Sequence, residues 1–242
     1  MSDPTADPLP AAPKWKPLDA RQRRVLGVMI EKAKTTPAAY PMTVNAIVTG
    51  CNQKNNRDPL TAYDDIDVEK ALDQLRVLGD VTEIDWMGRV SKYKHLAYDW
   101  FGVSRAELAV LAELLLRGAQ QLGELRARAA RMEPIADLAE LKPIVDSLVA
   151  RKLMVELSPP GRGQVVTHGA YPANELSEVR AAASGGTARV VEREPGEASR
   201  DAAPARERAP GELDALAAEV AELRSEVERL SDRVRELENR PG

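Results

Sequence analysis

Hydrophobic positions between residues 18 and 172 recur at helical spacing in two successive blocks. The segment LDARQRRVLGVMIEK, which starts at Leu18, aligns without gaps with VSRAELAVLAELLLR, which starts at Val103. Asp19 and Ser104 hold equivalent positions, and both are residue types that cap a helix by accepting hydrogen bonds from its first free backbone N–H groups. Apolar residues three or four positions apart follow each cap, so both segments are predicted to form amphipathic helices.

Each block continues with two more helices and a β-hairpin. The second helices are predicted at 43–51 and 122–132, and the third helices at 67–79 and 138–152. Two apolar strands follow across glycine-containing turns, at 80–86 and 90–98 in the first block and at 153–158 and 164–171 in the second. Three helices followed by a hairpin is the order of a winged helix-turn-helix domain. The pattern therefore predicts a mainly α (α+β) fold with two tandem winged-helix domains, at 17–100 (the first repeat) and 101–172 (the second repeat).

The remaining segments have different patterns. Residues 1–16 and 173–211 are rich in small, charged and proline residues and contain few large aliphatic ones, so we expect a disordered N-terminus and a disordered linker. Between 212 and 240 the apolar residues alternate in steps of three and four, at Leu213, Leu216, Val220, Leu223, Val227, Leu230, Val234 and Leu237. Position a is Leu and then three times Val, and position d is Leu four times, which favours a parallel coiled-coil homodimer. A trimer, a heterodimer, or a helix packed back on the repeats remain as alternatives.

Composition narrows the class of protein. Hydrophobic residues make up 43% of the 242 residues and aromatic residues 4%, which suits small cores of Leu, Val and Ala. No apolar run approaches the ~18 residues of a membrane span, and the acidic N-terminus does not resemble a signal peptide. One cysteine and two histidines provide neither a disulfide nor a His/Cys metal site, and there is no catalytic motif. We therefore expect a cytoplasmic protein that is not an enzyme, has no cofactor or metal, and has no membrane partner.

The charge is −4 overall, but residues 14–172 are almost neutral, with 23 basic and 20 acidic residues. Contacts to DNA must then come from local clusters. Three clusters are candidates: the polar stretch after the second helix, the first hairpin, and the second helix of the second repeat. Their residues are Asn52, Gln53, Lys54, Asn56 and Arg57; Arg89, Lys92 and Lys94; and Arg126, Arg128 and Arg131.

Each cluster also has a purely structural interpretation. The amides at 52–56 could stitch the following loop together through local hydrogen bonds, and the arginines at 126–131 could simply keep a helix solvated. The third helix of the first repeat carries Glu69 and Asp73 beside Lys70, which favours a solvated face over a helix inserted into DNA. Cys51 follows an apolar helix, so a packing role is expected for it.

Residues 18–172 also resemble a known family. The segments VLGVMIEKAKTTPAAYPMTVNAIVTGCNQKNNRDP (25–59) and LLLRGAQQLGELRARAARM (114–132) carry the resemblance, especially Tyr40-Pro41 and the run from Cys51 to Pro59. They are similar to the YceH-like family of uncharacterised bacterial proteins. The resemblance implies tandem winged-helix domains and a presumption of DNA binding.

These observations lead to two functional hypotheses. The first is a dimeric, cytoplasmic DNA-binding protein that acts as a transcriptional regulator. The alternative is a non-enzymatic assembly factor of the chromosome-organisation type, which uses tandem winged helices to bind other proteins. The near-neutral charge and the acidic third helix support the alternative.

Overall fold

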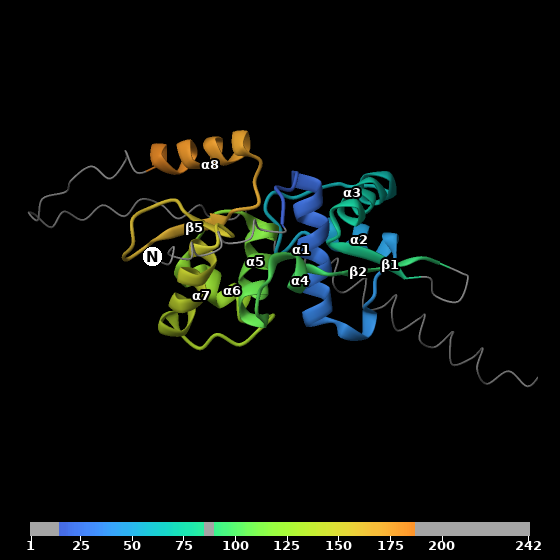
Figure 1. Cartoon of the computed structure of the whole chain (residues 1–242), viewed down its shortest axis with the longest axis horizontal. Coiled ribbons are helices and arrows are strands. Elements are labelled where there is room, and N and C mark those ends of the chain that lie inside the picture. Colours follow the sequence, from blue (N-terminus) through green and yellow to red (C-terminus); the bar gives the residue numbers. More distant parts are fainter. Residues whose placement is uncertain (1–14, 85–89, 187–242) are drawn as a thin grey trace, which may run out of the picture. The chain divides into compact units, whose positions relative to one another are not determined.

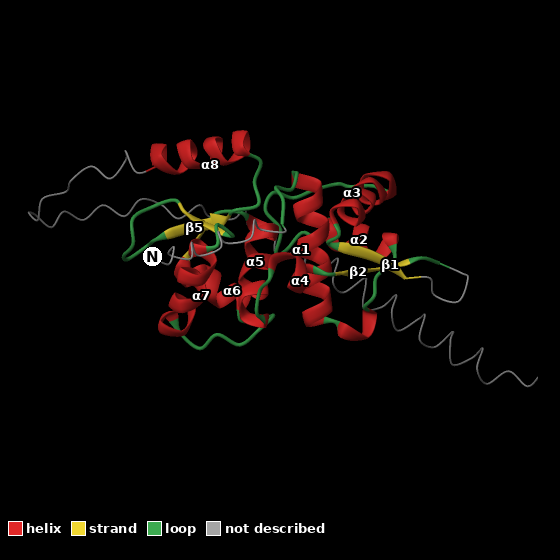
Figure 2. Cartoon of the chain, in the orientation of Figure 1, coloured by secondary structure: helices red, strands yellow, loops and turns green. Residues whose placement is uncertain are grey.

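Helices dominate the computed structural model, which describes residues 15–84 and 90–186 (Figures 1 and 2). In the first repeat the order is α1 (Ala20–Thr35), the short 3-10 helix η1 (Pro37–Ala39), α2 (Val44–Cys51), α3 (Asp65–Leu78), β1 (Val81–Ile84) and β2 (Lys92–His95). Helix α4 (Ala97–Phe101) leads into the second repeat. There the order is α5 (Arg105–Arg117), β3 (Gln120–Gln121), α6 (Leu122–Ala129), α7 (Leu138–Ala150), β4 (Met154–Glu156) and β5 (Val165–His168), followed by α8 (Ala173–Gly186). The expected mainly helical α+β class is confirmed.

The first helix of each repeat begins at the predicted cap. The Asp19 carboxylate accepts a hydrogen bond from the backbone N–H of Gln22 at 2.9 Å, and the Gln22 side chain accepts one from the Asp19 N–H at 2.8 Å. Ser104 and Glu107 form the same reciprocal pair at the start of α5. Two of the free N–H groups at each helix start are thereby satisfied, and this fixes where the two helices begin.

Both repeats end in small antiparallel sheets. Strand β1 pairs with β2, with Val81 opposite His95, and β4 pairs with β5, with Met154 opposite His168. Each hairpin also gains a short partner from the segment before the second helix: Met42 bridges to Tyr93, and β3 pairs with β5. These partners are one or two residues long, too short for a period-two pattern to reveal them.

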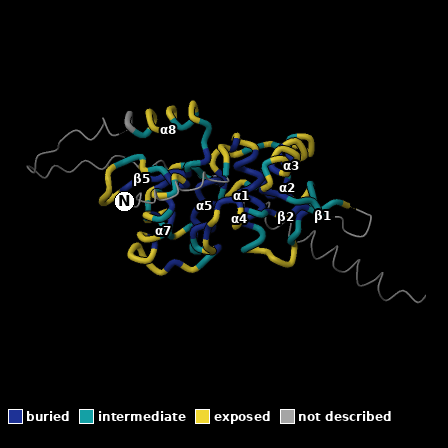
Figure 3. The backbone as a smooth tube through the Cα atoms, in the orientation of Figure 1, coloured by how far each residue is buried: buried dark blue, intermediate teal, exposed yellow. Residues whose placement is uncertain are grey.

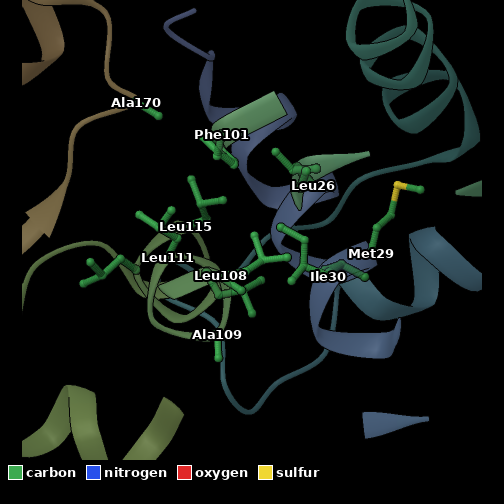
Figure 4. Close-up of a cluster of buried hydrophobic side chains, with 14 of the residues drawn as sticks. Leu26, Met29, Ile30, Phe101, Leu108, Ala109, Leu111, Leu115 and Ala170 are labelled. Carbon is green, nitrogen blue, oxygen red and sulfur yellow. The ribbon is translucent and has the colours of Figure 1, made fainter. Parts of the chain in front are cut away.

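Helices α1 and α5 pack against each other and join the cores of the two repeats. Figure 4 shows one cluster of buried side chains, with Leu26 and Ile30 from α1 and Leu108 from α5. A side chain at Gly27 would meet Leu116 at 3.0 Å, so a glycine in α1 allows the helices to approach closely. The described residues therefore form one compact unit across the expected boundary at 100/101.

The segment expected to be a disordered linker begins with a helix instead. Residues 173–186 form α8, which is anchored near its start by the ion pair between Glu175 and Arg23 at 2.6 Å. The expectation rested on the scarcity of large aliphatic residues, but an alanine-rich segment needs few of them once a charged contact fixes its first turn. The rest of the expected linker, the N-terminal residues 1–14 that we expected to be disordered, and the expected coiled coil at 212–240 lie outside the described residues.

Candidate functional site

The hairpin of the first repeat presents basic side chains on its outer face. Lys94 is exposed and Lys92 is half-buried, whereas Tyr93 and His95, which alternate with them, are buried. Successive side chains of a strand point to opposite faces, so Lys92 and Lys94 share one face, as the sequence predicts. Arg89, the third candidate of this hairpin, lies outside the described residues.

The polar stretch after α2 serves mainly to hold the loop that follows. The Asn52 side chain donates to the carbonyl of Tyr63 at 2.7 Å and accepts from the Tyr63 N–H at 2.8 Å. It also accepts a hydrogen bond from the hydroxyl of Thr61 at 3.2 Å. These contacts match the structural interpretation of Asn52. Lys54 is exposed on the same stretch and faces solvent.

Arg57 is buried and cannot reach DNA in this structure. Its guanidinium forms two hydrogen bonds with the Glu31 carboxylate, the shorter at 2.5 Å, and donates to the carbonyl of Gly50 at 2.9 Å. The Gln53 side-chain oxygen accepts a further hydrogen bond from the Arg57 guanidinium at 3.0 Å. Asn56, which has a left-handed backbone (φ 59°), accepts a hydrogen bond from Arg117 at 2.6 Å. Gln53, Asn56 and Arg57 therefore contact other protein groups.

The three arginines of the second repeat are also bound internally. Arg126 donates to the carbonyls that follow α6, at positions 135 and 136. Arg128 donates to the side chain of Gln120 at 2.7 Å and lies 3.5 Å from Glu124. Arg131 reaches into the first repeat and binds Glu31. Four of the arginines proposed from sequence are thus engaged in holding the fold.

Glu31 is the centre of an ionic network at the junction of the repeats. It binds Arg57 from its own repeat and Arg131 from the second repeat. Arg131 continues to Glu113 of α5 at 3.1 Å, and Glu113 pairs with Arg117 at 3.0 Å. Burial alone would raise the pKa of Glu31, but the hydrogen bonds and charges of Arg57 and Arg131 outweigh it and lower that pKa. Glu31 is therefore charged at neutral pH and joins the two repeats.

The two carboxylates of this network were not among the residues singled out from sequence. Glu31 directly follows the apolar run of α1, Glu113 interrupts the apolar run of α5, and both are buried. An acidic residue next to or inside an apolar helical stretch is the signal that could have found them, because a buried charge requires a partner. The sequence does not show which arginine provides it.

Cys51 and His95 are buried in the interior of the first repeat. Cys51 lies in the core, and burial raises the pKa of its thiol to about 12, which fits the expected packing role. Burial lowers the pKa of His95 to about 4, so its ring is neutral.

Among residues 15–84 and 90–186, no three His, Cys, Asp or Glu side chains are grouped so that they could hold a metal ion. Over the same residues, every helix is too short or too polar to span a membrane.

The chain is similar to known bacterial sequences. A UPF0502 protein from Rhodopirellula baltica is 51% identical over 160 residues, which cover 66% of this chain and 68% of the relative. A UPF0502 protein from Geobacter sulfurreducens is 49% identical over 128 residues, which cover 53% of this chain and 58% of the relative. A further one from Paracidovorax citrulli is 43% identical over 143 residues, which cover 59% and 61%. The match thus spans about three fifths of the last two relatives.

A family model described as "Protein of unknown function, DUF480" matches residues 18–162, which run from just before α1 to the turn between β4 and β5 and include the ionic network. The chain therefore belongs to the DUF480 (UPF0502) family of bacterial proteins.

Proposed function

We propose that the protein is a cytoplasmic DNA-binding regulator built from two winged-helix domains. The order of three helices and a hairpin in both repeats supports this proposal, as does the resemblance to the YceH-like family. The hairpin of the first repeat would contact the DNA backbone through Lys92 and Lys94. Such contacts to phosphate position a protein on the duplex without reading its sequence.

The single observation that carries the proposal is the outer face of this hairpin. Lys92 and Lys94 lie two residues apart on one side of β2, opposite the buried Tyr93. The arginines of the other clusters that the structure describes are engaged in internal contacts, so the proposed interface narrows to the exposed Lys94, with Lys92 beside it on the same strand face, and the exposed Lys54 after α2. Arg89, at the turn of the hairpin, extends the same basic cluster in sequence.

A DNA-binding assay on the full chain tests this proposal. We expect the Lys92→Ala/Lys94→Ala protein to bind a mixed-sequence duplex more weakly than the wild type, measured by fluorescence anisotropy at low salt. The matched control is Lys16→Ala/Lys142→Ala, which also removes two lysines. Lys16 lies exposed before α1, and Lys142 lies exposed on α7. Equal affinity of both variants would contradict a contact through the hairpin.

Dimerisation would double the number of DNA contacts. The heptad pattern from Leu213 to Leu237 supports a parallel coiled-coil homodimer. Linking two weak modules raises the effective concentration of the second once the first is bound. A dimer with one hairpin per subunit would therefore bind DNA more tightly than a single subunit.

A protein-binding assembly function is the second candidate, and the outer face of α3 favours it. Ile66 and Val77 are 73% and 88% exposed there, and Glu69 and Asp73 lie exposed between them. Figure 3 shows exposed residues along much of α3. Carboxylates repel phosphate, whereas an acidic and apolar face suits a basic protein surface. Wild-type protein that fails to bind DNA at low salt would favour this candidate.

A further inference from the structure

A cavity of about 330 Å³ lies at the junction of the two repeats, and Arg117 of the ionic network is one of its lining residues. The first repeat contributes Arg23 and Arg24 from α1 and Tyr63 from the loop after α2, and the second contributes Arg117 and His168. Cavities of a few hundred Å³ between packed units are typical places for small ligands. At about 30 Å³ for each water-sized group, this one has room for roughly ten non-hydrogen atoms.

The lining is rich in positive charge. Three arginines border the cavity, and Asp58 is the carboxylate among its lining residues. Arg23 is already paired with Glu175 and lies over the ring of Tyr171, with 4.6 Å between the guanidinium carbon and the ring centroid. Arg117 is paired with Glu113 at 3.0 Å. Arg24 is therefore the lining arginine that forms no ion pair among the described residues.

Two lining residues also carry polar atoms without a protein partner. Arg24 is 4% exposed; its Nη2 donates to the carbonyl of Pro59 at 2.6 Å, and its Nη1 has no hydrogen-bond partner among the described residues. His168 is also buried, and its Nδ1 has no hydrogen-bond partner among the described residues. The Arg24 guanidinium N–H is a buried donor without a partner, which costs free energy that a bound acceptor would recover. Burial and the charge of Arg57 lower the pKa of Arg24, so a neighbouring anion would stabilise its charged form.

We propose that this cavity binds a small anion, a carboxylate or a phosphate, with Arg24 as its principal partner. A guanidinium offers two parallel N–H donors to either group. Because both repeats contribute to the lining, the bound anion would hold them together and stabilise their junction. This binding does not depend on the proposed DNA contact, which lies on the β2 hairpin.

Calorimetric titration of the full chain in the absence of DNA tests the proposal, with inorganic phosphate in one series and succinate in the other. Sodium chloride keeps the ionic strength equal in every series. We expect binding of at least one anion at millimolar concentration, together with a rise in the melting temperature, because the ligand binds the folded state. Binding in one series identifies the ligand as a phosphate or a carboxylate, and heat in neither series would overturn the proposal.

Variants locate the site. Arg24→Gln removes the charge, and we expect the affinity to fall by about tenfold or more. Arg21→Gln is the matched control, because Arg21 lies on the same helix, pairs with Asp67 at 3.1 Å and does not line the cavity. Ala20→Leu fills the cavity from an exposed position without changing the charge, so it should abolish binding as well. This second variant keeps the test valid if Arg24→Gln disturbs the fold. Equal affinities of Arg21→Gln and Arg24→Gln, or unchanged binding in Ala20→Leu, would overturn the proposed location.

Discussion

Replacing Glu31 with glutamine would remove a buried charge that joins arginines of both repeats. The side chains of Glu31 and Arg57 are 2% and 0% exposed, and they lie 2.5 Å apart. Removing one partner of a buried ion pair costs roughly 3–5 kcal/mol, because the other charge stays buried without compensation. In the variant, Arg57 would still donate hydrogen bonds to three uncharged acceptors, the carbonyls of Gly50 and Asn56 and the side chain of Gln53. The loss of stability should therefore lie near the lower end of this range. Arg131 is 28% exposed and adds little, so we expect a loss of about 3 kcal/mol in the free energy of unfolding.

Urea unfolding followed by far-ultraviolet circular dichroism measures this loss. With a denaturant slope of roughly 2–3 kcal/mol/M, the midpoint of Glu31→Gln should fall by about 1 M while the slope stays unchanged. Glu124→Gln is the matched control, because Glu124 is 56% exposed and its pair with Arg128 is worth less than about 1 kcal/mol. A midpoint of Glu31→Gln equal to that of the control would refute the role of the network at the junction.

Three further outcomes follow from the structure and the sequence. The pKa of Glu31 is lowered on folding, so the charged carboxylate stabilises the folded protein at pH values above its unfolded pKa. The difference in unfolding free energy between wild type and Glu31→Gln should therefore shrink as the pH falls through the folded pKa. Gly169→Ala would place a methyl group against a backbone carbonyl oxygen and should cost about 3 kcal/mol or more in thermal unfolding, whereas Gly123→Ala, which meets open space, should stay within about 1 kcal/mol of wild type. Leu223→Lys/Leu230→Lys would put charges into the predicted coiled-coil seam and should sediment as a monomer; a persisting dimer would contradict the zipper.

Local signals predicted the helices well. The caps at Asp19 and Ser104 act within four residues, and the second helix of the first repeat begins after Thr43, as the sequence indicates. The start of α8 was missed because the contact that anchors it joins Glu175 to Arg23, which is 152 residues away. Sequence spacing alone does not reveal such a pair.

The roles of the arginines were harder to predict than the helices that carry them. Arginine is the residue type expected at a phosphate contact, yet Arg57 and Arg131 both bind Glu31. Glu31 is 26 residues away from Arg57 and 100 residues away from Arg131. An arginine that faces phosphate and an arginine that neutralises a buried carboxylate look alike in sequence. Lys92 and Lys94 were placed correctly because the alternation of a strand is a local property.

The salt dependence of DNA affinity tests the proposed function most directly. For wild-type protein, the logarithm of the binding constant should fall linearly with the logarithm of salt concentration, because each phosphate contact releases counterions. Lys92→Ala/Lys94→Ala should make that slope shallower by about 1.8, or about 0.9 for each lost contact. An identical slope in the two proteins, or a wild-type slope near zero, would contradict DNA binding through the hairpin of the first repeat.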